Sequence, residues 1–181
     1  MQLMIASDIH GDAACCQALL DAFQREKPDR LLLLGDLLYH GPRNPLPQDY
    51  DPQQVIRLLN EQKNHLLCVR GNCDCEVDQM VLDFPILAEY CLLYHKNRVL
   101  YVTHGHHACR QDPPPLGPRD ILLHGHTHIP AWEDFGQGNL YLNPGSVSIP
   151  KESSPRGYLL LTDQEALWKD LAGQVYHRLA L

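Results

Sequence analysis

The stretch SDIHGD, residues 7–12, follows directly on the apolar run MQLMIA, residues 1–6. An apolar run that ends in polar residues predicts a buried strand over Met1–Ser7. Three side chains that can bind a metal, Asp8, His10 and Asp12, come directly after it. Asp8 and His10 stand two apart, so on extended backbone their side chains point to the same side. The pattern indicates a metal-binding loop at the end of a strand.

The chain after this loop reads as a parallel α/β unit. Residues 13–26 carry apolar residues at helical spacing, and we expect Asp12 to cap this helix or to accept hydrogen bonds near the site rather than bind metal. Residues 29–35 (DRLLLLG) and 65–69 (HLLCV) are typical of buried parallel strands. Between them, Asp51 and Pro52 predict the start of a second helix.

The second half of the chain has a different pattern. Residues 86–103 predict a hairpin around a Lys96-Asn97 turn, and short strands are expected at residues 120–123, 139–142 and 158–161. Residues 165–181 suit a second hairpin that turns at Ala172-Gly173, with a helix as the alternative. A parallel first half and an antiparallel second half predict an α/β fold in which two sheets pack face to face with helices outside.

Composition narrows the classes of protein. The 181 residues suffice for one domain, residues 1–181, with its own core. Seven cysteines, and an opening without a basic segment and a long apolar one, predict reduced thiols and a cytoplasmic location. No apolar run approaches the roughly 18 residues of a membrane helix, so we expect no membrane association. A net charge of −7 gives no basis for strong nucleic-acid binding.

Polar motifs follow five of the predicted strands. Eleven histidines are present, and six of them fall within residues 104–128. Because open α/β sheets gather ligands beyond the carboxyl ends of their strands, we expect these motifs to meet at one site. Each motif alone is more often a turn or a surface loop, but five together favour a metal site. The motifs are SDIHGD (7–12), GDLLYHG (35–41), RGNCD (70–74), THGH (103–106) and HGHTH (124–128).

This ordered set of motifs resembles the calcineurin-like metallophosphoesterase superfamily. The longer strings GDLLYHGPRN, VRGNCD and NPGSVSIPK are similar to its small bacterial YfcE-type phosphodiesterase branch. The resemblance implies a four-layer αββα sandwich of two mixed sheets flanked by helices, with a dinuclear metal centre at one edge. It further implies two divalent ions, manganese first, with iron, zinc, nickel or cobalt as alternatives.

The resemblance also assigns ligands. It places one metal on Asp8, His10, Asp36 and His128 and the other on Asp36, Asn72, His104 and His126, so that Asp36 bridges the two ions. Carboxylate, imidazole and amide oxygen suit such ions, and the absence of thiolates from the set argues against a structural zinc site.

The expected reaction is hydrolysis of a small phosphodiester. In such a centre a hydroxide shared by two metals about 3.5 to 4 Å apart attacks phosphorus in line with the leaving oxygen. We therefore count Asp36, Asn72 and His104 as catalytic. Many members of the superfamily place a histidine after the motif asparagine to protonate the leaving group, and here that residue is Cys73. A thiol is the poorer proton donor at neutral pH, so Cys73 or His106 is the candidate donor.

Other polar residues keep two interpretations. His106 could reach substrate or could position His104. Arg43, with His40 and Asn44, could line the pocket and bind phosphate or could belong to an exposed loop. His107 and His124 have no assigned role. Residues 143–146 (NPGS) predict a structural turn that returns toward the metals.

Three alternatives to a phosphodiesterase stay open. A binding scaffold of this fold, such as the retromer relatives, would be free to lose metal ligands, and this chain retains all seven. A nuclease would favour a basic groove, and a phosphomonoesterase or protein phosphatase would favour histidine at position 73. The sequence also leaves open whether the chain forms a homo-oligomer.

Overall fold

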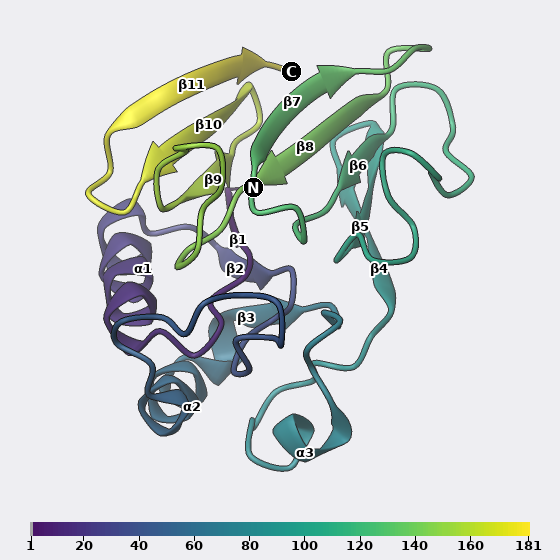
Figure 1. The fold of residues 1–181 in the computed structure, drawn as a ribbon. Helices are drawn as coiled ribbons and strands as arrows, with labels where there is room; N and C mark the ends of the chain where they lie inside the picture. Colours follow the sequence, from purple (N-terminus) through teal and green to yellow (C-terminus); the bar gives the residue numbers. More distant parts are fainter. Residues whose placement is uncertain (1) are drawn as a thin grey trace.

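The computed structural model describes residues 2–181 and contains two mixed β-sheets (Figure 1). The six-stranded sheet has the order β11-β10-β9-β1-β2-β3. Strands β1, β2 and β3 from the first half of the chain are parallel to one another, whereas β9, β10 and β11 from the second half pair antiparallel with their neighbours. Its strands are β1 (Leu3–Ala6), β2 (Arg30–Leu33), β3 (Leu66–Cys68), β9 (Gly157–Leu161), β10 (Glu165–Asp170) and β11 (Val175–Ala180).

The five-stranded sheet has the order β4-β5-β6-β8-β7. Its central strands β5, β6 and β8 are parallel, and only the edge strands β4 and β7 run antiparallel to their neighbours. The strands are β4 (Tyr90–His95), β5 (Arg98–Thr103), β6 (Ile121–Leu123), β7 (Pro130–Asp134) and β8 (Leu140–Pro144).

The prediction of an antiparallel second half is therefore wrong for the central strands β5, β6 and β8. Parallel neighbours need a crossover, and here residues 104–120 and 124–139 cross over without an α-helix, so no helical periodicity reveals them. Strand β7 was not predicted. The first predicted hairpin, residues 86–103, begins later than expected, because residues 86–89 precede β4. Met1 of the predicted first strand lies outside the described residues. Both predicted hairpins are confirmed, with turns at residues 96–97 and 171–174.

Two longer helices cover the outer face of the six-stranded sheet. Helix α1 (Ala13–Glu26) is capped by Asp12, as expected, and the Asp12 carboxylate accepts a hydrogen bond from the Cys15 N–H at 2.8 Å. Helix α2 (Pro52–Glu61) is capped by Asp51 and has Pro52 as its first residue, as predicted. Helix α3 (Glu76–Gln79) is a single turn, and a 3-10 turn spans Lys63–His65. None of the helices within residues 2–181 has the length and apolar content that crossing a membrane requires.

Two apolar cores form because β1 and β2 are buried on both faces. Met4 and Leu31 pack against α1 and α2, while Ile5 and Leu32 pack between the sheets. Strands covered on both sides read as unbroken apolar runs, and such a run precedes SDIHGD. The face-to-face sheets with helices outside are thus confirmed. Within residues 2–181 the packed helical layer lies over the six-stranded sheet, and the outer face of β4 carries exposed side chains such as Tyr94.

Candidate metal centre

The loops after β1, β2, β3, β5 and β6 meet at one edge of the two sheets. The Asp8 N–H donates to the Gly35 carbonyl at 3.1 Å, and the His126 N–H donates to the Asp8 carboxylate at 3.1 Å. The first hydrogen bond joins the loops after β1 and β2 within the six-stranded sheet, and the second connects that sheet to the loop after β6 of the other sheet. They bring together the seven side chains predicted as metal ligands, Asp8, His10, Asp36, Asn72, His104, His126 and His128.

Asp8, His10 and His128 form one half of the centre. The Asp8 Oδ1 atom lies 3.5 Å from His10 Nε2 and 3.2 Å from His128 Nε2, and the two imidazole nitrogens are 3.2 Å apart. Asp8 and His10 are fully buried. Asp8 Oδ1 is also buried and has no hydrogen-bond partner. A buried carboxylate oxygen without a donor, facing two imidazole nitrogens, fits a cation site.

His104, Asn72 and His126 form the other half. His104 Nε2 lies 3.1 Å from both Asn72 Oδ1 and His126 Nδ1. Asp36 stands between the halves, because its Oδ2 atom is 3.5 Å from His104 Nε2 and 3.7 Å from His10 Nε2. One carboxylate oxygen thus faces both clusters, which is the position that a bridging ligand requires.

Backbone carbonyls orient three of the imidazoles. The Nδ1 atoms of His10, His104 and His128 lie 2.8, 2.6 and 2.7 Å from the carbonyl oxygens of Tyr39, Leu34 and Ile149. A carbonyl only accepts hydrogen bonds, so each Nδ1 carries the proton and donates it. Each Nε2 lone pair is then left facing the centre, as in metal sites whose histidines are held from behind.

The buried charges favour a cation. Burial alone would raise the pKa of Asp8, but the adjacent imidazoles of His10 and His128 hold that pKa well below its ordinary value. Burial alone would lower the pKa of His104, but Asp36 and Asp8 raise it to about 9. The carboxylates thus draw protons onto the neighbouring imidazoles. Divalent ions would supply that positive charge in place of the protons.

Most of the ligand loops have left-handed backbone. Asp8 and His10 have φ values of 60° and 51°, so the extended backbone predicted for this pair is wrong. Positive φ is uncommon for residues other than glycine and clusters at functional sites, where surrounding contacts maintain it. Five of the seven predicted ligands share it, namely Asp8, His10, Asp36, His126 and His128.

Two glycines let the loops after β2 and β3 touch. A Cβ atom on Gly35 would collide with the backbone nitrogen of Gly71, and one on Gly71 would collide with the Asp36 carboxylate. Gly35 also has a positive φ of 94°, whereas Gly71 does not, so Gly71 is needed for the close approach rather than for a turn.

Sequence reasoning overlooked Asp74, which fixes the position of Asp36. The buried Asp74 carboxylate accepts hydrogen bonds from the N–H groups of Asp36, Leu37 and Gly71 at 2.8, 2.9 and 2.7 Å. Asp74 thereby joins the two loops that the glycines bring into contact. Its place at the end of the RGNCD motif was the available signal, but a lone aspartate there reads as an ordinary turn residue.

Two serines that follow β8 hold the backbone of Asp8. The hydroxyls of Ser146 and Ser148 donate to the Asp8 carbonyl at 2.9 and 3.0 Å, and the Val147 N–H donates to the Ser7 carbonyl at 3.0 Å. The turn predicted at residues 143–146 therefore returns to the centre and positions a ligand loop. Ser148 was not singled out from the sequence.

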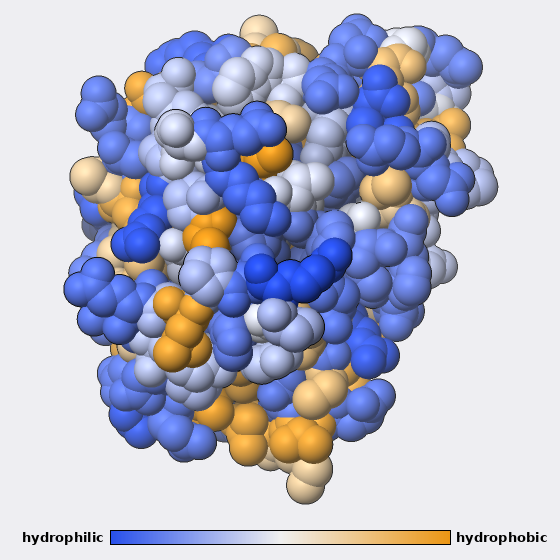
Figure 2. Space-filling model, in the orientation of Figure 1, coloured by the Kyte–Doolittle hydropathy of each residue, from blue (hydrophilic) through white to orange (hydrophobic). Residues whose placement is uncertain are grey.

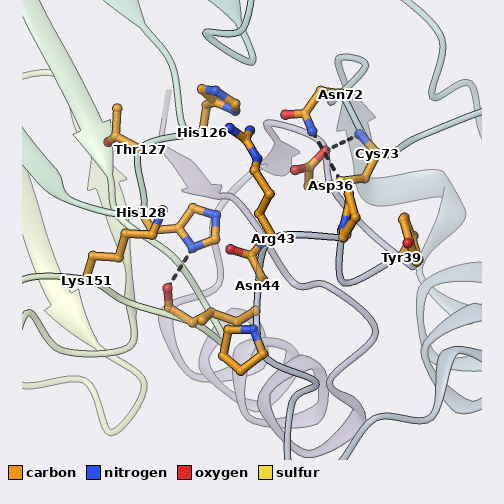
Figure 3. Close-up of a pocket in the computed structure, with 14 residues that line it drawn as sticks. Asp36, Tyr39, Arg43, Asn44, Asn72, Cys73, His126, Thr127, His128 and Lys151 are labelled. Carbon is orange, nitrogen blue, oxygen red and sulfur yellow. Dashed lines mark hydrogen bonds between the residues drawn. The ribbon is translucent and has the colours of Figure 1, made fainter.

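A cavity of about 950 Å³ opens over the centre (Figure 3). Asp36, Asn72, His126 and His128 line it from the ligand set. Arg43, Asn44 and Lys151 also line it, and Figure 3 shows the Arg43 side chain extending across the cavity toward the ligands. His40 does not line it, and its ring lies edge-on to Tyr39 and Tyr50. Of the three residues predicted to line the pocket, Arg43 and Asn44 therefore line the cavity and His40 does not.

The other three histidines of residues 104–128 do not line the cavity. The His106 ring is edge-on to His104 at 5.4 Å and does not line the cavity. Burial and then the charge on His104 lower the pKa of His106 to about 4, so its ring is neutral at pH 7. His124 stacks on Tyr141 and accepts a hydrogen bond from the Arg110 N–H at 3.2 Å. His107 is exposed beside His106.

Cys73 lies in the cavity beside the bridging carboxylate. Its N–H donates to Asp36 Oδ1 at 2.8 Å, and its thiol accepts from the Asn72 amide at 3.2 Å. Burial first, and then the charge of Asp36, raise the pKa of the thiol. Cys73 therefore keeps its proton at neutral pH and is a weaker acid than a free cysteine.

Comparison with known proteins gives consistent matches. Residues 1–166 match the calcineurin-like phosphoesterase superfamily domain. The chain is 45% identical to phosphodiesterase YfcE of Escherichia coli (strain K12) over 161 residues, which cover 89% of this chain and 87% of that protein. The solved structure of Yfce, a phosphoesterase from E. coli, superposes with a TM-score of 0.95 at 41% identity over 99% of each chain. Zinc-bound Vps29 from Entamoeba histolytica has the same fold, with a TM-score of 0.59 at 21% identity over 99% of each chain.

Replacing Asp74 tests whether it holds the centre in place. Asp74→Ala leaves three buried N–H groups without an acceptor, so we expect a loss of about 3–5 kcal/mol in the free energy of unfolding. Urea denaturation of metal-free protein measures this. Metal content after reconstitution should fall as well, because Asp36 loses its support. Asp78→Ala removes a carboxylate that accepts one N–H group, from Cys75, and should cost about 1 kcal/mol or less. Equal losses in the two variants would contradict the role of Asp74.

Proposed function

Because this chain belongs to the calcineurin-like phosphoesterase superfamily, we propose that it is a metal-dependent phosphodiesterase. The observation that carries the proposal is the Asp36 carboxylate, whose Oδ2 atom stands between His10 and His104 with the other four ligand side chains around it. The name of the relative at 45% identity, phosphodiesterase YfcE, supports a diester as substrate. We propose that residues 1–181 act as one domain, since β1 and β9 pair within one sheet.

The residues present fit two divalent ions. Asp8, His10, Asp36 and His128 would hold one ion, and Asp36, Asn72, His104 and His126 the other. Oxygen and imidazole donors without thiolate suit manganese, which we propose first. When bound, such ions supply Lewis-acid charge and lower the pKa of a coordinated water, which can then attack phosphorus.

The chain's own residues bind and orient the diester. Arg43 and Lys151 stand at the cavity that holds the ligands, where their positive charges can pair with the phosphate oxygens. Asn44 is held by a hydrogen bond from its amide to the His40 carbonyl at 2.8 Å, and it lines the same wall. The net charge of the chain is −7, so these two cations provide local attraction for an anion in an otherwise acidic protein.

The leaving oxygen has a weak proton donor. Among the lining residues, Cys73 occupies the position after Asn72 where other members of the superfamily place histidine. Its raised pKa makes proton donation at pH 7 slow. His106 is the other candidate, but its neutral ring packs edge-on against His104 and does not line the cavity. We therefore propose diesters whose leaving groups are stable as anions as the favoured substrates.

Metal removal tests the central claim. Stripping the protein with a chelator should lower hydrolysis of bis(4-nitrophenyl) phosphate by more than about 100-fold, because the nucleophile depends on the ions. Manganese should restore the rate, with metal content followed by elemental analysis. Circular dichroism of the stripped protein is the control for folding. Full turnover by folded, rigorously metal-free protein would exclude the mechanism.

Asp36→Asn tests the bridge. The change weakens one ligand to each ion, so bound metal and kcat should both fall further than in His126→Gln, which removes a ligand from one ion. We expect a loss in kcat of at least about 100-fold. Near-normal metal content and rate in Asp36→Asn would show that Asp36 does not bridge.

Cys73→His tests the proton donor. A positioned imidazole can contribute roughly 100-fold by general acid catalysis, and it helps poor leaving groups most. Rates for aryl and alkyl esters of graded leaving-group acidity should depend less steeply on that acidity in the variant than in the wild type. Cys73→Ala is the control and should keep the wild-type slope. Parallel lines for wild type and Cys73→His would remove position 73 from proton transfer.

A further inference from the structure

A second cavity of about 420 Å³ lies beside the metal-centre cavity. It is a groove between the loop of residues 37–50, helix α2 and helix α3, and we call it the apolar groove. Most of its wall is hydrophobic or aromatic, and its principal lining residues are Leu38, Tyr39, Tyr50, Ile56, Val77 and Val81. A volume of this size accommodates a ring system or a short acyl group.

The apolar groove adjoins the cavity over the metal ligands. Tyr39 and Cys73 line both spaces. The Cys73 N–H donates to Asp36 Oδ1, so the junction lies next to the bridging carboxylate. A molecule whose phosphate sits at the metal centre could therefore extend one substituent past Cys73 into the groove.

The groove exposes side chains that a surface usually hides. Val77 is 66% exposed, Tyr39 43% and Val81 41%. Figure 2 shows hydrophobic side chains gathered over α3 at the bottom of the view. An exposed apolar patch that adjoins a cavity with charged side chains in its wall is typical of a ligand-binding surface.

The charges around the two cavities differ. Asp78 is the one charged side chain among the described residues that line the groove, and its Oδ2 atom accepts the Cys75 N–H at 2.9 Å. Arg43 and Lys151 line the metal-centre cavity and not the groove. A second phosphate or carboxylate would meet no cation in the groove, whereas an uncharged ring would find apolar walls and two tyrosines to pack against.

We propose that the apolar groove binds an uncharged, ring-sized arm of the phosphodiester substrate, while the phosphate lies at the metal centre near Arg43 and Lys151. The substrate class is thus a diester with one aromatic or similarly apolar ester arm. This inference rests on the proposed function for the position of the phosphate. The observation specific to it is that the groove adjoins the cavity, with Tyr39 and Cys73 in the walls of both.

Binding of phosphinates tests the groove without any reaction. Methyl(2-naphthylmethyl)phosphinate and dimethylphosphinate carry the same single charge as a diester and have no ester bond to hydrolyse. On manganese-loaded protein, naphthyl fluorescence gives the dissociation constant of the first, and displacement gives that of the second. We expect the naphthyl compound to bind at least about 10-fold more tightly, because the groove buries its rings.

A matched pair of variants locates the site. Val77→Glu places a carboxylate in the groove wall and should reduce the preference to about 3-fold or less. Met80→Glu adds the same charge three residues away at a side chain that is 83% exposed and does not line the groove, so the wild-type preference should remain. Because both ligands are monoanions, the ratio of their dissociation constants cancels the general effect of added negative charge.

Each outcome decides the proposal. A wild-type ratio near one, or equal ratios in Val77→Glu and Met80→Glu, would overturn it. A ratio near one together with a lower molar mass for Val77→Glu in light scattering would identify the groove as a contact between copies of the chain, and would overturn it as well. Failure to hydrolyse any diester would reject the proposed function, while the phosphinate ratio would still report on the groove.

Discussion

The structure depends on keeping the Asp36 carboxylate charged and in place inside the protein. Its Oδ1 atom accepts the Cys73 N–H, its Oδ2 atom faces His10 and His104, and its backbone N–H donates to Asp74. A buried charge is costly unless it is paired and hydrogen-bonded, so the protein must place hydrogen-bond donors and imidazoles around Asp36. Loops from both sheets supply them, which explains why the strand ends converge.

The same requirement accounts for the strained backbone. Left-handed φ at five predicted ligands costs energy that only the surrounding structure can offset. Hydrogen bonds from Ser146 and Ser148 to the Asp8 carbonyl, and from three N–H groups to Asp74, hold those loops. The packed cores on both faces of β1 and β2 give these contacts a rigid base. The apolar cores and these backbone hydrogen bonds thus hold the ligand loops, while the ligand atoms themselves remain available to a cation.

The surroundings of the centre are asymmetric, and Cys73 lies at the boundary. On one side, Arg43 and Lys151 line the cavity over the ligands, where their charges suit an anion. On the other, tyrosines and aliphatic side chains line the apolar groove. A thiol at this boundary suits an apolar neighbour better than an imidazole would, while providing a weaker acid. Leaving-group chemistry and substrate shape would then be linked through a single residue.

Much of this protein follows from local sequence patterns. The apolar runs of β1, β2 and β3, the helix caps Asp12 and Asp51, and the hairpin turns at residues 96–97 and 171–174 were predictable, because each depends on neighbours in the chain. The ligand types were also predictable from the motifs that follow the strands. The parallel order of β5, β6 and β8 was not, because loops without helical periodicity connect them. Asp74 and the apolar groove required the tertiary structure, since their roles arise from residues far apart in sequence that meet only when the two sheets and the helices pack.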